Sequence, residues 1–413
     1  MKICLLTYRG NMYCGGQGIY IYYLAREFQH LGHEVHVISG PPYPQLPEGV
    51  KLYKVKSHSA YVSRYHMDNH LDNHSGPIRN PVDLYEAVAT RMGMYSEPLA
   101  FSIRAYDAIR KLNSKIKFDV VHDNQCLGYG LPLIKRHKLP LVATIHHPMA
   151  LDRDSDFAQA RNQIEKWRRW WFYSVYVPMQ SFVGRRADRV ITVSECSARE
   201  IERLMGIPSS RIRVVYNGID TDVFKNDDGL PKKSNSLIFV GNTEDRKKGI
   251  IYLLQAIKML ENECPVKLTI IDGGAPEAQY APALMQQINL NGRVTFARRL
   301  SGDDLVKWYS AADIAVVPSM FEGFGFPAAE AMACGIPVIA FSAGALPELV
   351  DDGKTGILVP PADVPKLAAA IKKLVENKEL RCEMGKEARK RVLRKFNWQQ
   401  AARQIIDVYQ EVL

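Results

Sequence analysis

The stretch of residues 311–347 constrains the fold more than any other part of this chain. It contains a short apolar run, Ile314–Val317, of the kind that forms a buried strand. A glycine-rich segment follows, and Pro327 then stands where a helix favours its first residue, ahead of several good helix formers. Gly335 is placed to end that helix, and Val338–Phe341 predicts a second buried strand. The pattern therefore predicts a strand, a glycine loop, a helix and a strand in succession.

Such a unit can hold an anion at its loop, where backbone amides are open and the positive end of the helix dipole lies. Two acids bracket the loop: Glu322 at its entry and Glu330 in the expected first helical turn. Because phosphates repel carboxylates, we expect these acids to accept hydrogen bonds from neutral hydroxyls of a sugar or a ribose. An acid in a first helical turn is also stabilised by the dipole without any ligand, and this interpretation stays open for Glu330 alone.

These residues resemble the signature of the retaining enzymes of glycosyltransferase family 4, which is two glutamates separated by seven residues around a glycine-rich loop. Pro337 and the segment of residues 344–348 also fit that family's pattern. The resemblance implies that Glu322 is catalytic and holds hydroxyls of the transferred sugar, and that Glu330 grips the ribose diol. It also implies that the donor is bound by the loop residues Gly323, Phe324, Gly325 and Phe326.

Composition places the chain among ordinary globular proteins. Its 413 residues suit two domains, and apolar residues make up 46% and charged residues 24%. No apolar run approaches the ~20 residues of a membrane helix, and the first six residues are typical of a strand, not of a signal peptide. Seven scattered cysteines, without metal or redox spacing, favour reduced thiols in a cytoplasm. The net charge of +10 would attract phosphorylated substrates, nucleic acid or an anionic membrane, and does not choose among them.

A second glycine loop lies between a strand at residues 3–6 and a helix at residues 19–31. A dinucleotide site is disfavoured there, because Ile21 stands where a third small residue should pack and the next strand ends in Ser39 instead of an acid. A simple tight turn is the alternative to a binding loop. The resemblance favours binding, because the family's N-terminal loop faces the donor diphosphate, and it implies that role for Gly15 and Gly16.

Histidines raise two further hypotheses. His66, His70 and His74 could share one helix face and bind a metal, but the asparagines, glycine and proline around them favour a solvated, substrate-facing loop. The family resemblance implies that this region helps form the acceptor pocket. His146 follows a predicted strand at residues 141–145, and the carboxyl ends of parallel strands face the ligand crevice. The family resemblance implies that His146 contacts the transferred sugar.

Residues 161–189 form an aromatic and basic stretch with seven cations and two acids. Such a face could lie on anionic lipid or meet a phosphorylated acceptor. The alternative, which the sequence alone favours, is an ordinary helix with its tryptophans in the core and its charges in solvent.

The second half opens with a strand at residues 236–240 and a loop that carries Arg246, Lys247 and Lys248 just before a helix. Cations at a helix start oppose its dipole, so their presence suggests a bound anion such as a diphosphate. Lys248 occupies the family's phosphate-binding lysine position, which implies catalytic and donor-binding roles. The family usually has an arginine where this chain has Asn242, and Arg246 is our candidate to replace it.

The nucleotide base is expected near the next two strands. Gly273 follows a strand at residues 268–271, and the resemblance implies that it binds the donor. A further strand ends near Phe296, where the family's usual glycine is missing and Ala297 and Arg298 follow instead. The identity of the base therefore stays open.

Strand and helix alternate in both halves, so we predict two Rossmann-like, doubly wound α/β domains facing across a cleft, similar to the GT-B arrangement. The predicted domains are an acceptor-side domain at residues 1–215, a nucleotide-sugar-binding domain at 216–393, and a helix at 394–413 that crosses back onto the first domain.

The resemblance implies a hexosyltransferase that takes its sugar from a nucleoside-diphosphate sugar, UDP-linked by preference over GDP-linked, and passes it to an unknown acceptor hydroxyl with retention. It implies no metal and no other cofactor, and we expect no nucleic-acid partner. A nucleotide-sugar epimerase and a non-catalytic nucleotide-sugar-binding protein on the same scaffold are the alternatives. We expect a cytoplasmic protein, with peripheral contact at the inner membrane face if residues 161–189 bind lipid.

Overall fold

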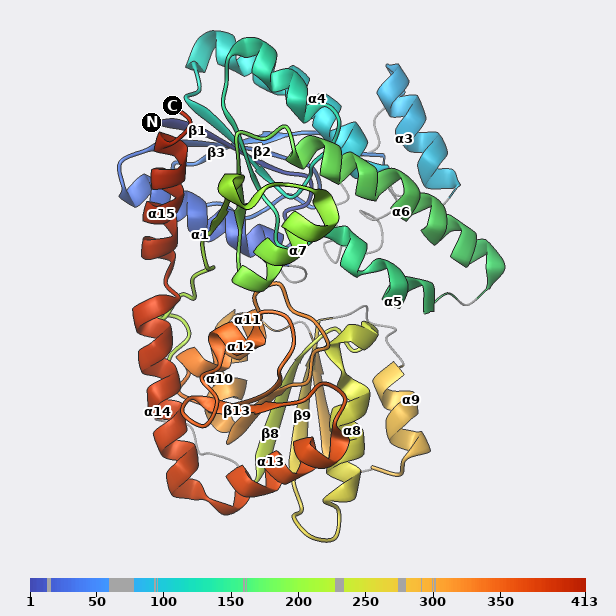
Figure 1. The fold of residues 1–413 in the computed structure, drawn as a ribbon, viewed down its shortest axis with the longest axis vertical. Coiled ribbons are helices and arrows are strands. Elements are labelled where there is room, and N and C mark those ends of the chain that lie inside the picture. Colours follow the sequence, from blue (N-terminus) through green and yellow to red (C-terminus); the bar gives the residue numbers. More distant parts are fainter. Residues whose placement is uncertain are drawn as a thin grey trace. The chain divides into compact units, whose positions relative to one another are not determined.

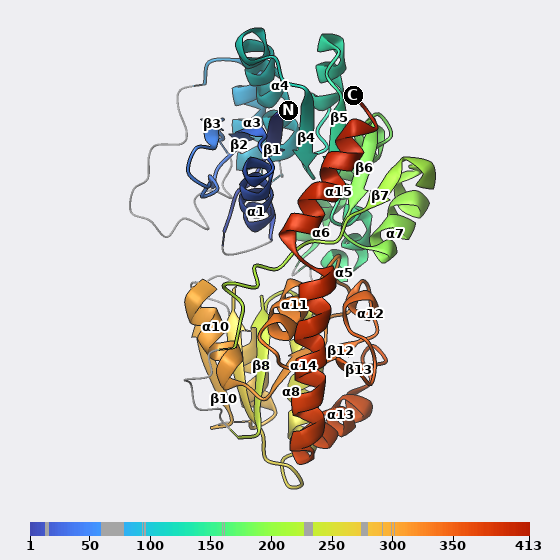
Figure 2. The ribbon, with the colours of Figure 1, turned by 90° about the vertical axis from the view of Figure 1, so that its left-hand side faces the viewer.

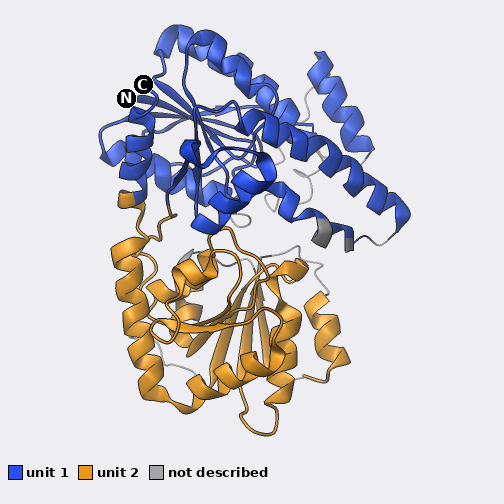
Figure 3. Cartoon of the chain, viewed as in Figure 1, with its two compact units in different colours: residues 1–215, 401–413 blue, residues 216–400 orange. Residues whose placement is uncertain are grey.

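The structure is a computed structural model in which the chain forms two compact units (Figures 1 and 3). Unit 1 contains residues 1–215 and 401–413, and unit 2 contains residues 216–400. All residues are described except 13–15, 59–77, 93, 95, 159, 161, 227–233, 274–279, 291, 299 and 301. Gly15 and the three histidines His66, His70 and His74 therefore lie outside the described residues.

Unit 1 is built on a seven-stranded parallel sheet with the strand order β3-β2-β1-β4-β5-β6-β7. Its strands are β1 (Lys2–Thr7), β2 (Glu34–Ser39), β3 (Lys51–Lys54), β4 (Val120–Asn124), β5 (Leu141–Thr144), β6 (Arg189–Thr192) and β7 (Ile212–Val214). Its α-helices are α1 (Gln17–His30), α3 (Pro81–Arg91), α4 (Glu97–Ile116), α5 (Arg153–Ala158), α6 (Gln163–Gly184), α7 (Glu195–Met205) and α15 (Trp398–Gln410).

Buried side chains on both faces of this sheet hold the helices in place. Phe101 of α4, Val183 of α6 and Ile201 of α7 share one apolar cluster with strand residues. The helices α1 and α15 lie on the side turned toward the viewer in Figure 2, where the rings of Phe28 and Tyr409 are 5.7 Å apart. The last helix of the chain is therefore part of the core of unit 1.

Unit 2 has a six-stranded parallel sheet with the order β10-β9-β8-β11-β12-β13. Its strands are β8 (Ser236–Gly241), β9 (Lys267–Asp272), β10 (Val294–Arg298), β11 (Ile314–Val317), β12 (Val338–Phe341) and β13 (Gly356–Val359). Its α-helices are α8 (Ile250–Met259), α9 (Tyr280–Gln287), α10 (Gly302–Ala311), α11 (Phe326–Ala333), α12 (Leu346–Leu349), α13 (Val364–Glu376) and α14 (Lys378–Lys395).

The predicted fold class is confirmed, because both units are parallel sheets flanked by helices. The strands expected at Ile314–Val317 and Val338–Phe341 have those bounds. The sequence also predicts a buried strand at residues 118–122, but β4 begins two residues later than that pattern, at Val120. From residue 41 to about residue 80 the sequence predicts loose order, which is wrong for β3, the edge strand that pairs with β2. In the part of the chain that is described, no helix has both the length and the apolar character to cross a bilayer.

Gly249 shows how closely the loops of unit 2 pack. It precedes α8 with φ of +70°, and a Cβ atom there would lie 1.9 Å from the carbonyl oxygen of Pro318. Gly353 has a similar φ of +75°, but a Cβ atom would meet nothing within 4 Å. A side chain at Gly353 would therefore meet only the energetic cost of the left-handed backbone conformation. A side chain at Gly249 would meet that cost and the contact with Pro318 as well.

We predict that Gly353→Ala lowers the free energy of unfolding by about 1–2 kcal/mol, the usual cost of a left-handed alanine. Gly249→Ala should cost clearly more, because the loop after β11 must also move. Urea unfolding of both variants measures the difference, and equal losses would contradict the close approach.

Candidate active site

Two loops of unit 2 meet at the carboxyl ends of the neighbouring strands β8 and β11. Lys248 Nζ donates a hydrogen bond to Glu322 Oε1 over 2.8 Å, and Ser319 Oγ donates to the same oxygen over 2.8 Å. The main chain joins the loops as well, since the amide of Met320 donates to the carbonyl of Lys247 over 2.8 Å. A lysine from one loop and a carboxylate from the other are thus held side by side.

The Glu322 carboxylate stabilises the charged form of Lys248. Burial alone would lower the pKa of Lys248, but the adjacent Glu322 carboxylate outweighs burial and raises it. The lysine is therefore a cation at neutral pH, and the Lys248 and Glu322 side chains are only 26% and 10% exposed. Glu322 is thus an anion beside Lys248 in the structure, and the diphosphate expected at the cations before α8 stays a prediction.

The glycine loop after β11 presents main-chain donors. Gly325 caps α11 with φ of +101°, a conformation that a side chain would strain. No described residue accepts a hydrogen bond from the amides of Gly323, Phe324, Gly325 or Phe326. Phe324 is a buried residue, 4% exposed.

Glu330 lies elsewhere on α11 than expected. The helix begins at Phe326, with Pro327 second, so Glu330 is in the second turn and not in the first. The dipole interpretation is therefore wrong for this residue. Glu330 is 9% exposed and accepts a hydrogen bond from the Tyr309 hydroxyl over 3.0 Å. Burial raises the pKa of Glu330 from 4.5 to about 7, against the opposing effect of the Tyr309 hydrogen bond.

In unit 1, His146 follows the carboxyl end of β5. Its Nε2 lies 2.8 Å from the side-chain oxygen of Asn124, and the edge of the Tyr20 ring packs at 5.0 Å between ring centroids. Burial, with a smaller effect of His147, lowers the pKa of His146 to about 3. The imidazole is therefore neutral, and with the Asn124 oxygen as acceptor its proton is on Nε2. Gly16 caps α1 with φ of +72°.

Arg246 and Gly273 are the other residues of unit 2 that were predicted to bind the donor. The Arg246 guanidinium lies 5.4 Å from the centroid of the Tyr280 ring of α9, and Arg246 is exposed to solvent. The Gly273 amide lies 3.4 Å from the Gly241 carbonyl, so it joins two strand ends. Gly16 and His146 belong to unit 1, and all the other described site residues belong to unit 2. Among the described residues, no group of three or more His, Cys, Asp or Glu could hold a metal ion, and metal independence stays a prediction.

A cavity of about 560 Å³ lies between α9 and β10. It is lined by Pro282, Met285, Gln286, Phe296 and Arg298. Apolar walls with a few polar groups are typical of sites for small planar molecules. The sequence predicted the nucleotide base near the strand end at Phe296, but it did not predict the contribution of α9, because that depends on how the helix packs.

We predict that Glu330→Gln changes how stability depends on pH. Between pH 4.5 and about 7 the unfolded state holds fewer protons at this residue than the folded state, so stability falls as pH rises through that window and is level above it. The loss is on the order of 3 kcal/mol, and Glu330→Gln should remove it. Urea unfolding at the two ends of the window measures it. The exposed Glu376→Gln is the control, and an unchanged slope for Glu330→Gln would contradict the prediction.

Family models match both halves of the chain. The model described as glycosyl transferases group 1 matches residues 220–391, and the model described as glycosyltransferase family 4 matches residues 14–223. The second match includes His146, and the first includes Lys248, Glu322 and Glu330.

Relatives match over long alignments. The chain is similar to the MMP alpha-(1->4)-mannosyltransferase of Mycolicibacterium hassiacum, with 37% identity over 416 residues that cover 100% of this chain and 98% of the relative. It is also similar to the D-inositol 3-phosphate glycosyltransferase of Acidothermus cellulolyticus, with 32% identity over 72% of this chain and 68% of the relative.

Solved structures resemble the whole chain. Sucrose-phosphate synthase from Thermosynechococcus elongatus has a TM-score of 0.74 at 23% identity and covers 100% of this chain and 98% of its own. Anabaena Alr3699/HepE in complex with UDP-glucose has a TM-score of 0.72 at 18% identity and covers 100% of both chains. At these identities the likeness shows the fold alone.

Proposed function

Because the chain belongs to the group 1 glycosyltransferases, of the family 4 type, we propose that it moves a hexose-type sugar from a nucleoside-diphosphate sugar to an acceptor hydroxyl with retention of configuration. The observation that carries this proposal is the Lys248–Glu322 pair beside a loop with open amides, at the carboxyl ends of β8 and β11. UDP-sugars are the favoured donors and GDP-sugars the other candidates. The mannosyltransferase relative makes mannose the first sugar to test.

The chemistry assigned to unit 2 is stabilisation of a leaving diphosphate. The Lys248 cation and the amides of residues 323–326 can donate hydrogen bonds to phosphate oxygens as negative charge grows there. A phosphate at Lys248 competes with Glu322 for the ammonium group, which leaves the carboxylate able to accept hydrogen bonds from sugar hydroxyls. Glu330 would bind the ribose diol in its ionised form.

Retention is proposed to proceed by attack on the same face as the leaving group. The acceptor oxygen forms its bond to the anomeric carbon as the bond to the phosphate oxygen breaks, and the acceptor proton passes to the phosphate. No described carboxylate of the site has been assigned as a covalent nucleophile, and no step of this scheme uses a metal or another cofactor. For His146 the proposed role stays the one implied by the resemblance, contact with the transferred sugar.

We also propose a cytoplasmic location. Cys4, Cys126, Cys264 and Cys334 are buried thiols that form no disulfide, which suits a reducing compartment.

We predict that Lys248→Ala lowers donor turnover by about ten- to a hundredfold. The variant loses a charge-assisted hydrogen bond, worth roughly 1.5–3 kcal/mol, to the leaving phosphate. Steady-state kcat/KM for the donor measures the effect. Lys258→Ala is the matched control, because this lysine of α8 pairs with Glu261 on the surface. Equal kinetics of the wild type and Lys248→Ala would reject the phosphate role.

The proposed function predicts nucleotide release from one member of a panel of UDP- and GDP-sugars, accelerated by an acceptor and unaffected by a chelator. Mass spectrometry identifies the product, and NMR of its anomeric proton reports retention or inversion. Glu322→Gln keeps the shape of the side chain and should abolish most turnover. A changed sugar still attached to its nucleotide would indicate an epimerase, and binding without release would indicate a non-catalytic protein. Either result, or inversion, contradicts the proposal.

A further inference from the structure

Helix α6 of unit 1 turns large apolar side chains toward solvent. Trp167, Trp170 and Trp171 are 51%, 53% and 42% exposed. The favoured expectation from sequence, that the tryptophans of this stretch lie in the core, is therefore wrong. Ile164 is 66% exposed and Val175 is 38% exposed on the same helix. Several large apolar side chains exposed on one helix indicate a surface that binds a partner.

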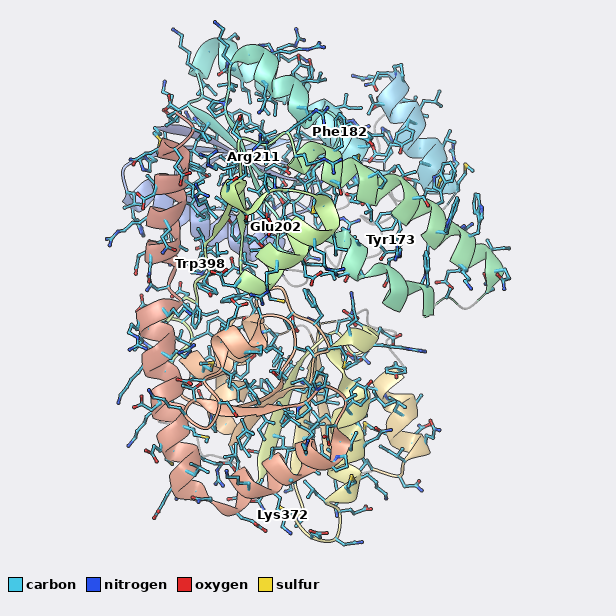
Figure 4. The ribbon with its side chains drawn as sticks, in the orientation of Figure 1. Tyr173, Phe182, Glu202, Arg211, Lys372 and Trp398 are labelled. Atoms are coloured by element: carbon cyan, nitrogen blue, oxygen red, sulfur yellow. The ribbon has the colours of Figure 1, made fainter. Side chains whose placement is uncertain are left out.

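Four of these residues form a single stripe. Ile164, Trp167, Trp171 and Val175 follow one another at spacings of three and four residues, which places them on one face of the helix. The rings of Trp167 and Trp171 stack with their centroids 6.2 Å apart. The opposite face carries Tyr173, whose hydroxyl donates to a carboxylate of α5 (Figure 4). The stripe is thus the side of α6 that points away from unit 1.

The charges beside the stripe are positive. Lys166 and Arg168 are exposed next to the tryptophans. The one acid in the sequence of α6, Glu165, is bound by Arg169 at 2.5 Å. Arg168 therefore lies at the margin of the apolar stripe, whereas Lys166, seven residues before Tyr173, adds an exposed cation on another face of α6.

Helix α3 repeats this arrangement on the same side of unit 1 (Figure 1). Leu84, Val88 and Met92 are 53%, 44% and 47% exposed. Its two acids, Asp83 and Glu86, are buried and held by Arg104 of α4, at 2.7 Å and 2.5 Å. That inward pairing removes negative charge from the exposed face of α3, which keeps the cation Arg91.

We propose that the stripes of α6 and α3, together called the α3/α6 surface, dock this protein on an anionic lipid membrane. Tryptophan prefers the boundary between headgroups and acyl chains, and lysine and arginine are attracted to anionic headgroups. A second copy of the chain fits less well. A two-fold contact through this surface would bring Arg168 toward the Arg168 of the other copy, in a protein of net charge +10. This property is independent of the proposed transfer reaction.

The test is flotation of the full chain with vesicles of phosphatidylcholine alone or mixed with phosphatidylglycerol. We expect flotation with the anionic vesicles at low salt, little with the neutral ones, and strong weakening at about 1 M salt, where charges are screened beyond ~3 Å. Brominated lipids should quench tryptophan fluorescence on binding, because three of the five tryptophans are the exposed ones of α6. Absence of flotation with anionic vesicles at low salt would overturn the proposal.

Paired variants separate the surface from general charge. Lys166→Glu with Arg168→Glu should weaken vesicle binding at least about thirtyfold, and Trp167→Ser with Trp171→Ser should also weaken it. The controls are Lys378→Glu with Lys386→Glu, an equal charge change on exposed residues of α14, and Met259→Ser with Leu393→Ser, which removes exposed apolar groups of unit 2.

Either control losing as much binding as its α6 counterpart would overturn the assignment. So would a dimer, seen by sedimentation, that the Trp167→Ser and Trp171→Ser changes dissolve, because it would assign the surface to a second copy. Donor hydrolysis without vesicles should be the same in all four variants and the wild type. Failure of membrane binding is therefore distinguishable from failure of the proposed function.

Discussion

The ion pair between Lys248 and Glu322 is the interaction on which the candidate site depends. The two residues are 74 positions apart and meet only because β8 and β11 are neighbours in the sheet, with Leu237 opposite Ile314. Removing one partner of such a partly buried pair leaves the other charge uncompensated, so the pair favours a single arrangement of both loops. A positive and a negative group are therefore in position before any ligand binds.

Main-chain packing makes that arrangement rigid. A Cβ atom at Gly344 would lie 2.5 Å from the carbonyl oxygen of Glu322, and the Ala345 amide donates to that same oxygen over 2.9 Å. On the other loop, the buried Thr243 donates through both its amide and its hydroxyl to the carboxylate of Asp272, at the end of β9. Three adjacent strand ends are thus joined, which limits how far Lys248 and Glu322 can move when a donor binds.

Much of the fold could be predicted because buried parallel strands are short apolar runs bounded by polar or glycine residues. Ile314–Val317 and Val338–Phe341 are such runs, and their bounds in the structure are those of the sequence pattern. The shift at β4 arises because Phe118 is apolar but precedes the sheet, where its amide donates to the side chain of Asn113. The sequence pattern also placed Glu330 one position too early in its helix, because it put the start of the helix at Pro327. A proline favours either of the first two helical positions, and here Pro327 takes the second.

The exposure of the α6 tryptophans could not be predicted, because helical spacing identifies an apolar stripe without saying whether it faces the core. The opposite face of α6 decides which way the stripe points, because Tyr173, Tyr176 and Met179 on that face fill the interior of unit 1. The pairing of Asp83 and Glu86 with Arg104 was equally hidden, since the arginine comes from another helix 21 and 18 residues away.

The ends of the strands differ in charge between the two units, and this contrast bears on what each unit can bind. In unit 1, burial lowers the pKa of His122 and His146 to about 3 and raises that of Asp123 to about 7, so the histidines are neutral and the acid is largely so below that pH. Asp123 Oδ1 is buried without a hydrogen-bond partner among the described residues. In unit 2, the Lys248 cation is paired with Glu322 and lies in the loop next to the glycine loop, whose amides of residues 323–326 have no acceptor among the described residues. Neutral hydrogen-bonding groups suit sugar hydroxyls, and a cation with main-chain donors suits a diphosphate. The two sets of groups thus fit the proposal in which unit 2 binds the phosphates and the neutral groups of unit 1 face sugar hydroxyls.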